Sequence, residues 1–289
     1  MAATLYLVAT PIGNLEDITF RAIRILRDEV SVIACEDTRQ TSKLLAHFEI
    51  RKPLVSYHEH NEEERVAELI AVLERGDSVA LVSDAGTPLV SDPGYRLVRA
   101  TVEKGLRVVP LPGASAVLAG LAASGLPTDQ FRFVGFLPSK AAARRKALEA
   151  LAGEPMSVVA YESPHRILET LADMAETLGN RPMVLARELT KLHEEFLRGT
   201  AEDIWRELDS RGSVKGEITL VLGRSEEKPA IHDPVAEVMR LEQDQGLGRM
   251  DAIKTVAKQM GIGKREIYRL LSGPDAEEPD NNPKDRRRG

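Results

Sequence analysis

Short apolar runs alternate with segments of helical spacing through the first half of the chain. Residues 5–9, 32–35, 54–57, 79–82 and 107–111 form such runs, and residues 18–26 place apolar side chains on one helical face. The runs are apolar at consecutive positions, so we expect both faces of each strand to be buried. This pattern predicts a largely parallel sheet that is covered by helices on both sides.

The second half of the chain shows a different mixture of strands and helices. Candidate strands lie at residues 131–136, 157–161, 183–187, 196–199 and 217–222. Helical patterns separate most of them, which predicts a second α/β domain with a mixed sheet. Turn-forming residues at 125–127 place a boundary between an N-terminal domain, residues 1–126, and a second domain, residues 127–224.

A polar linker without a core pattern follows at residues 224–229. Apolar residues at helical spacing then recur between residues 253 and 271, on either side of a turn that contains two glycines. This spacing is typical of a helix-turn-helix motif. We therefore expect a small helical module at residues 232–273 and a disordered tail at residues 274–289.

The helical module is basic, although the protein as a whole is acidic. The chain has 39 Lys and Arg against 45 Asp and Glu, and its net charge of -6 argues against nucleic-acid binding over the whole surface. Residues 249–271 nevertheless hold six Lys or Arg and two acids. Any RNA contact is therefore expected to be local. The candidate side chains are Lys254, Lys258, Lys264, Arg265 and Arg269.

The single cysteine, Cys35, excludes an internal disulfide and is typical of a protein in a reducing cytosol. It has no companion cluster of Cys or His. Further along the chain, His58, Glu59 and His60 are better explained as an exposed loop than as a metal site. We expect no metal. The N-terminal residues lack the pattern of a signal peptide, and no run approaches the roughly 18 apolar residues of a membrane helix. We expect a cytoplasmic protein without membrane contact.

Two strand-end segments carry the strongest indication of a ligand. Residues 83–94, SDAGTPLVSDPG, follow the strand predicted at 79–82, and residues 10–15, TPIGNL, follow the first strand. Ligands of open α/β sheets bind at the carboxyl ends of strands, where small residues let the backbone approach. The segment at residues 10–15 lacks the patterns of a nucleotide-hydrolysing or dinucleotide-binding loop. The alternative interpretation is an ordinary turn rich in Gly and Pro.

Further motifs follow in order along the chain. They are CEDTRQTSKLL from residue 35, PGASA from residue 112, YESPHR from residue 161, RELTKLHEE from residue 187 and GEITLVLG from residue 216. With the two strand-end segments, this set resembles the bacterial 16S ribosomal RNA ribose 2'-O-methyltransferases of the tetrapyrrole methylase superfamily. The resemblance covers roughly residues 5–223 and extends into the helical module.

The resemblance implies a fold, a cofactor and a substrate. It implies an α/β fold of two domains with S-adenosylmethionine in the cleft between them, a small C-terminal helical module and a homodimer. It further implies methylation of the ribose 2'-hydroxyl of a cytidine in the decoding centre of 16S ribosomal RNA. We expect the substrate RNA to be part of the small ribosomal subunit, and we expect no binding of DNA.

The resemblance also assigns cofactor contacts to the strand-end motifs of both domains. Those of the first domain are Pro11, Asp84, Ala85, Gly86, Ser91, Gly113, Ala114, Ser115 and Ala116. Those of the second domain are Tyr161, Ala186, Glu188, Gly216, Glu217 and Ile218. Their chemistry agrees with this ligand, because the amino group of the cofactor needs acceptors and its sulfonium is repelled by cations.

Methyl transfer to a hydroxyl needs the oxygen to be positioned and its proton to be accepted. The first candidates are Glu36, Asp37 and Arg39, at the end of the second predicted strand. Two further groups are Glu162 with His165 and Arg166, and Glu188 with Lys191, Glu194 and Glu195. Each of these residues is also consistent with a surface ion pair or a helix cap, so the sequence does not single out one base.

Arg144 and Arg145 begin a helix of the second domain and are candidates for phosphate contact; a solvated helix face is the alternative.

Two other functions compete with RNA methylation. One is methylation of a small tetrapyrrole or corrinoid precursor, which the basic module opposes. The other is a helix-turn-helix regulator whose α/β body senses a small ligand, and only an enzyme would turn the cofactor over.

Overall fold

The computed structural model describes residues 3–225, 233–260 and 262–272. The chain forms two compact units, Met1–Arg224 and Ser225–Gly289. Within the described ranges, no helix is both long and apolar enough to cross a membrane. The tail predicted at residues 274–289 lies outside the described residues.

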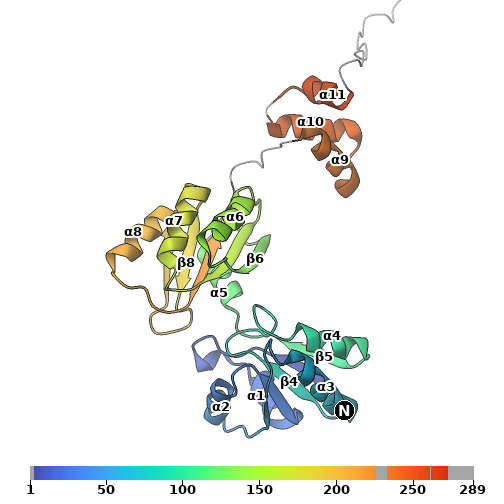
Figure 1. The fold of residues 1–289 in the computed structure, drawn as a ribbon, viewed down its shortest axis with the longest axis vertical. Helices are drawn as coiled ribbons and strands as arrows, with labels where there is room; N and C mark the ends of the chain where they lie inside the picture. Colours follow the sequence, from blue (N-terminus) through green and yellow to red (C-terminus); the bar gives the residue numbers. More distant parts are fainter. Residues whose placement is uncertain (1–2, 226–232, 261, 273–289) are drawn as a thin grey trace, which may run out of the picture. The chain divides into compact units, whose positions relative to one another are not determined.

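The first sheet of the larger unit is entirely parallel (Figure 1). Its strands are β1 (Thr4–Val8), β2 (Val32–Cys35), β3 (Leu54–Ser56), β4 (Val79–Val82) and β5 (Arg107–Leu111), in the order β3-β2-β4-β1-β5. Its helices are α1 (Phe20–Arg24), α2 (Thr38–His47), α3 (Glu62–Glu74) and α4 (Tyr95–Glu103). A short 3₁₀ helix, η1 (Leu15–Asp17), precedes α1, and a π-helical segment, η2 (Ile25–Glu29), follows it.

Two apolar cores cover the two faces of this sheet. Ala80 and Val82 of β4 belong to the core with Ile25, whereas Val79 and Leu81 belong to the core with Leu69. Successive side chains of a strand point to opposite faces, so each apolar run supplies both cores. Full burial of a Val, Leu or Ile side chain stabilises the fold by about 1.5–3 kcal/mol. The predicted parallel sheet is confirmed.

The second sheet is mixed, as the sequence predicts. Its strands are β6 (Phe131–Phe136), β7 (Ser157–Glu162), β8 (Met183–Arg187), β9 (Glu195–Gly199) and β10 (Ile218–Leu222), in the order β6-β7-β10-β8-β9. Only β6 and β7 pair in parallel. The core on one face joins the sheet to α6 (Ala141–Ala152), α7 (Ile167–Leu178) and α8 (Ala201–Ser210), which lie beside it in Figure 1.

Helix α5 (Ala116–Ser124) covers the other face of the second sheet. Val117 and Leu121 pack with Val159, Val184 and Val221 in one core. The sequence grouped this helix with the first domain because it follows the last strand of the first sheet. By packing it belongs with the second sheet, since its apolar side chains find their partners there.

The smaller unit contains three helices within its described residues. They are α9 (Pro234–Gln245), α10 (Arg249–Met260) and α11 (Lys264–Ser272). Helices α10 and α11 are the two that the apolar spacing predicts, and α9 precedes them. Val238, Ile253, Val256 and Ile267 are buried in the core that the three helices share. A three-helix arrangement lets each short helix bury its apolar stripe.

Candidate active site

A pocket of about 410 Å³ opens where the ends of the first sheet's strands face the second sheet. Nine of the predicted cofactor contacts line it: Asp84, Ala85, Gly86, Ser91, Ser115, Ala116, Tyr161, Glu217 and Ile218. The other six do not line it: Pro11, Gly113, Ala114, Ala186, Glu188 and Gly216. The tertiary structure therefore brings together loops that follow β1, β4, β5, β7 and the start of β10.

Hydrogen bonds join the strand-end loops of the first sheet into one wall. The backbones of Thr10 and Gly86 exchange two hydrogen bonds, of 2.9 and 3.0 Å. The hydroxyl of Ser83 donates to the carbonyl of Gly86 at 2.7 Å, and that of Thr87 donates to the carbonyl of Ala114 at 3.1 Å. Gly86 has a φ of +87°, which only glycine adopts without strain. These bonds fix the loop that carries Asp84 and Ser91.

Two of the residues that do not line the pocket support the residues that do. A Cβ at Gly113 would lie 2.7 Å from the Cβ of Ala9, so this glycine lets the loop after β5 approach the end of β1. Glu188 accepts from the backbone of Glu217 at 3.1 Å and from Nζ of Lys191 at 2.8 Å. The hydrogen bond from Lys191 lowers the pKa of Glu188.

Lys191 also connects the two halves of the site. Its aliphatic stem occupies the space beside Gly13, where a Cβ would lie 2.3 Å from Cγ of the lysine. Its ammonium contacts Glu217 at 3.0 Å. The glycine of the TPIGNL segment thus leaves room for a side chain of the second sheet.

The charge of the pocket is one-sided. Four acids line it, Asp84, Asp92, Glu162 and Glu217, and no Lys, Arg or His does so among the residues that the structure describes. Burial and the nearby carboxylates of Glu36 and Asp84 raise the pKa of Asp92 to about 6. Burial and the charge of Asp92 also raise the pKa of Tyr161 on the opposite wall.

Asp92 is not among the predicted site residues, although it lies within the SDAGTPLVSDPG segment. The pocket also includes Glu162, which the sequence offered as a candidate base, and seven residues that were not predicted: Ile12, Thr87, Val90, Phe136, Ser163, Pro164 and Thr219. All of these except Phe136 belong to the motifs quoted above or directly adjoin the residues predicted from them. The signal was present in the motifs, but the choice within each motif needed the folded geometry.

The cluster of Glu36, Asp37 and Arg39 does not line the pocket. Asp37 is the N-cap of α2 and accepts a hydrogen bond from the backbone of Arg39 at 2.8 Å, so this residue has the role of a helix cap. Hydrogen bonds from Arg39 lower the pKa of Asp37. The backbone N–H of Asp37 donates to Asp84 at 3.1 Å, so this segment positions a residue that does line the pocket.

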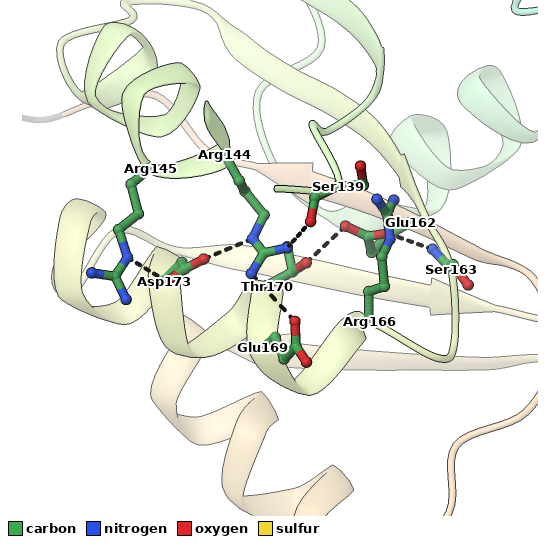
Figure 2. A network of polar contacts seen from close by, with 9 residues as sticks. All are labelled: Ser139, Arg144, Arg145, Glu162, Ser163, Arg166, Glu169, Thr170 and Asp173. Carbon is green, nitrogen blue, oxygen red and sulfur yellow. Dashed lines mark hydrogen bonds and ion pairs between the residues drawn. The ribbon is translucent and has the colours of Figure 1, made fainter. Parts of the chain in front are cut away.

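Glu162 has a buried carboxylate with three donors. It accepts from the backbone of Ser163 at 2.6 Å, from the guanidinium of Arg166 at 2.5 Å and from the hydroxyl of Thr170 at 2.8 Å (Figure 2). These bonds hold the turn that places Ser163 and Pro164 in the pocket wall. His165 is exposed on the same turn. Glu162 therefore organises one side of the pocket.

A family model for tetrapyrrole (corrin/porphyrin) methylases matches residues 4–204. The chain belongs to this family. A relative from Halalkalibacterium halodurans is 50% identical over 92% of this chain and 94% of its own length, and one from Bacillus subtilis is 45% identical over 91% and 92%. Each of them is named ribosomal RNA small subunit methyltransferase I.

Solved structures support the tetrapyrrole methylase fold. A cobalt precorrin-4 methyltransferase superimposes with a TM-score of 0.57 at 18% identity and covers 76% of this chain and 94% of that one. Uroporphyrin-III C-methyltransferase from Thermus thermophilus, solved with S-adenosyl homocysteine, gives 0.53 at 21% identity over 76% and 97%. At these identities the likeness concerns the fold.

The basic side chains of this family member divide into buried and exposed groups. Arg144 is only 1% exposed, and its guanidinium contacts Asp173 at 2.7 Å (Figure 2). Burial of its side chain contradicts the predicted phosphate contact, because the ion pair occupies the guanidinium inside the second domain. Arg145 contacts the same carboxylate at 2.7 Å, but half of its side chain remains exposed.

The helical module presents basic side chains to solvent. Lys258, Lys264, Arg265 and Arg269 are exposed and have no ion-pair partner among the described residues. Lys254 differs because it contacts Asp251 at 2.9 Å.

Residues 3–225, 233–260 and 262–272 contain no cluster of three or more His, Cys, Asp or Glu that could hold a metal ion.

Proposed function

We propose that the protein transfers a methyl group from S-adenosylmethionine to the ribose 2'-hydroxyl of a cytidine in the decoding centre of 16S ribosomal RNA. The observation that carries this proposal is the name shared by relatives between 43 and 56% identical, ribosomal RNA small subunit methyltransferase I. The motif set resembles enzymes that act on the ribose of a cytidine, which supports the choice of atom and base. The assembled small subunit is the proposed form of the substrate.

The pocket fits the proposed cofactor. Its volume of about 410 Å³ lies within the range of roughly 300–1,000 Å³ that is typical of small-molecule sites. Asp84 and Glu217 offer acceptors for an ammonium group, and the absence of lining cations in the described pocket suits a sulfonium. The sulfonium supplies an electrophilic methyl group when bound. Ala85, Gly86 and Ala116 leave space for a flat base beside their backbone.

The exposed basic residues of α10 and α11 supply the proposed RNA contact. Lys258, Lys264, Arg265 and Arg269 lie within one small unit of a chain whose net charge is -6. Phosphate contacts position an RNA without reading its sequence. The module therefore supports binding to the ribosomal RNA, while the choice of nucleotide depends on the pocket.

Transfer of radiolabelled methyl groups tests the function directly. The full-length protein is incubated with labelled S-adenosylmethionine and, in parallel, small ribosomal subunits that lack the modification, naked ribosomal RNA, and DNA. Label in 2'-O-methylcytidine from subunits, after digestion to nucleosides, is the expected result. Absence of label from every RNA, with the cofactor still bound, would contradict the proposal and favour a small-molecule substrate or a sensor.

A further inference from the structure

We propose that the carboxylate of Asp92 accepts the proton of the ribose hydroxyl during methyl transfer. This inference rests on the proposed function, because it assigns a role within that reaction. Asp92 lies in the loop between β4 and α4 and lines the pocket together with Asp84 and Tyr161. A general base needs a lone pair that faces the reactants and is not already engaged.

The other acids of the pocket are engaged by neighbours. Asp84 accepts from the backbone of Asp37 at 3.1 Å, and Glu217 contacts the ammonium of Lys191 at 3.0 Å. Glu162 is enclosed by three donors. Asp92 has neither a hydrogen bond nor an ion pair within the described part of the chain. It is therefore the acid of this pocket with a free carboxylate.

The loop holds Asp92 in place through its backbone. Leu89 and Ser91 have φ values of 71° and 65°, a left-handed backbone conformation that residues other than glycine rarely adopt. Beyond Asp92, the backbone of Gly94 donates to Glu62 at 3.1 Å, and a Cβ there would lie 2.7 Å from Leu81. Strained backbone persists only where surrounding structure determines it, and it concentrates at functional sites.

The electrostatics of the pocket suit the same role. Burial raises the pKa of Asp92 to about 6, and the negative charges of Glu36, directly after β2, and of Asp84, on the same loop, contribute to this shift. Tyr161 faces it from β7. No Lys, Arg or His lines the described pocket to offset this. A carboxylate whose conjugate acid has a pKa near 6 is a stronger base than the carboxylate of an exposed aspartate, and it is still ionised at neutral pH.

The step balances without a further reactant. The ribose oxygen forms a bond to the methyl carbon while the carbon–sulfur bond breaks and sulfur keeps the electron pair. The proton of the hydroxyl passes to Asp92, which releases it to solvent after the reaction. The sulfonium charge is lost as the carboxylate is neutralised, so no net charge develops in the pocket.

The experiment compares the full-length wild type with Asp92→Asn, Asp92→Glu and Glu36→Gln. Three quantities are measured: the dissociation constant of S-adenosylmethionine by calorimetry, the pH dependence of kcat on small subunits, and the carboxylate titration of the protein alone by carbon-13 NMR. Asp92→Asn is expected to lower kcat by about 10²–10⁴-fold, the typical contribution of a general base, with unchanged cofactor affinity. Asp92→Glu is expected to restore part of the loss.

The pH profile supplies a readout that a structural role would not move. The wild type should lose activity as pH falls through an inflection at or below about 6, the pKa of the free carboxyl. Glu36→Gln removes a like charge, so it should lower both the titration midpoint of Asp92 and the kinetic inflection.

Each failure points to a different conclusion. A wild type that methylates no RNA would overturn the proposed function. A wild type that methylates RNA beside an equally active Asp92→Asn variant would overturn the role of Asp92 alone. Loss of cofactor affinity in Asp92→Asn would also overturn that role, because it would make Asp92 a cofactor contact. The role of Asp92 would also be overturned if Glu36→Gln left the inflection of the pH profile of kcat unchanged.

Discussion

Nε of Arg144 lies 2.7 Å from a carboxylate oxygen of Asp173, and both side chains are almost completely buried (Figure 2). The pair joins α6 to α7 beneath the surface of the second domain. Arg145 contacts the other oxygen of Asp173 but remains half exposed. Two adjacent arginines thus meet the same carboxylate in very different surroundings.

We expect Arg144→Ala to lower the free energy of unfolding by about 3–5 kcal/mol, because it leaves a buried carboxylate without its inner partner. Arg145→Ala is the matched control and should cost at most about 1 kcal/mol, since an exposed ion pair is screened by water. Denaturant unfolding followed by the fluorescence of Trp205, the only tryptophan, measures both. Equal losses in the two variants would contradict this distinction.

Gly113→Ala should destabilise the larger unit by about 1–3 kcal/mol and weaken binding of S-adenosylmethionine. The added Cβ would lie 2.7 Å from the Cβ of Ala9, and neither atom can rotate away, so the backbone of the strand-end loop must shift. Gly248→Ala is a suitable control, because nothing lies within 4 Å of a Cβ at that position. Thermal unfolding and calorimetry together check the result.

Asp84→Ala should weaken the binding of S-adenosylmethionine by at least about tenfold, since a hydrogen bond to a charged group contributes about 1.5–3 kcal/mol. The pocket would lose one of its acids and the acceptor for the backbone of Asp37. Asp77→Ala, in an exposed turn away from the pocket, provides the control. Unchanged affinity in Asp84→Ala would remove Asp84 from the cofactor site.

The stability of the protein should depend on the ionisation of Asp92. Its folded-state pKa of about 6 is above the ordinary value of 3.8, so the folded state binds more protons than the unfolded state between these values. Stability from this group therefore falls as pH rises through that window and stays lower above it. A shift of about two units corresponds to at most about 3 kcal/mol, and partial exposure to water reduces it.

Asp92→Asn removes the loss of folding stability that ionisation of Asp92 causes, because an amide does not ionise. The variant should be more stable than the wild type above pH 6, and the difference should vanish near pH 4. Denaturant unfolding at a series of pH values measures it. A variant that is less stable than the wild type at pH 7 would indicate that the carboxylate makes a favourable contact in solution.

Alanine at both Lys264 and Arg265 should weaken binding to the small ribosomal subunit and leave cofactor affinity unchanged. Each phosphate contact contributes close to one unit to the slope of log affinity against log salt, so the slope should fall by about two. Lys254→Ala is the comparison, since Asp251 already pairs with that ammonium at 2.9 Å. A slope that does not change would place the RNA contact elsewhere on the protein.

The sequence by itself determined the elements and the segments that build the pocket. Apolar periodicity is a local property, so the strands of both sheets and the helices α10 and α11 followed from it. The strand-end position of residues 83–94 indicated a ligand, because the carboxyl ends of parallel strands share one edge of a sheet. Nine of the fifteen predicted cofactor contacts line the pocket, and six of these nine follow strands of the parallel sheet: Asp84, Ala85, Gly86, Ser91, Ser115 and Ala116.

Only the tertiary structure decided how similar residues differ in role. Arg144 and Arg145 are equivalent in sequence, and the packing of α7 buries one of them. Burial raises the pKa of Asp92, and the charge of Glu36, which is 56 positions away in the chain, raises it further. Helix α5 follows the first sheet but finds its apolar partners on the second. Burial and electrostatic environment depend on contacts between distant segments, and local patterns do not specify them.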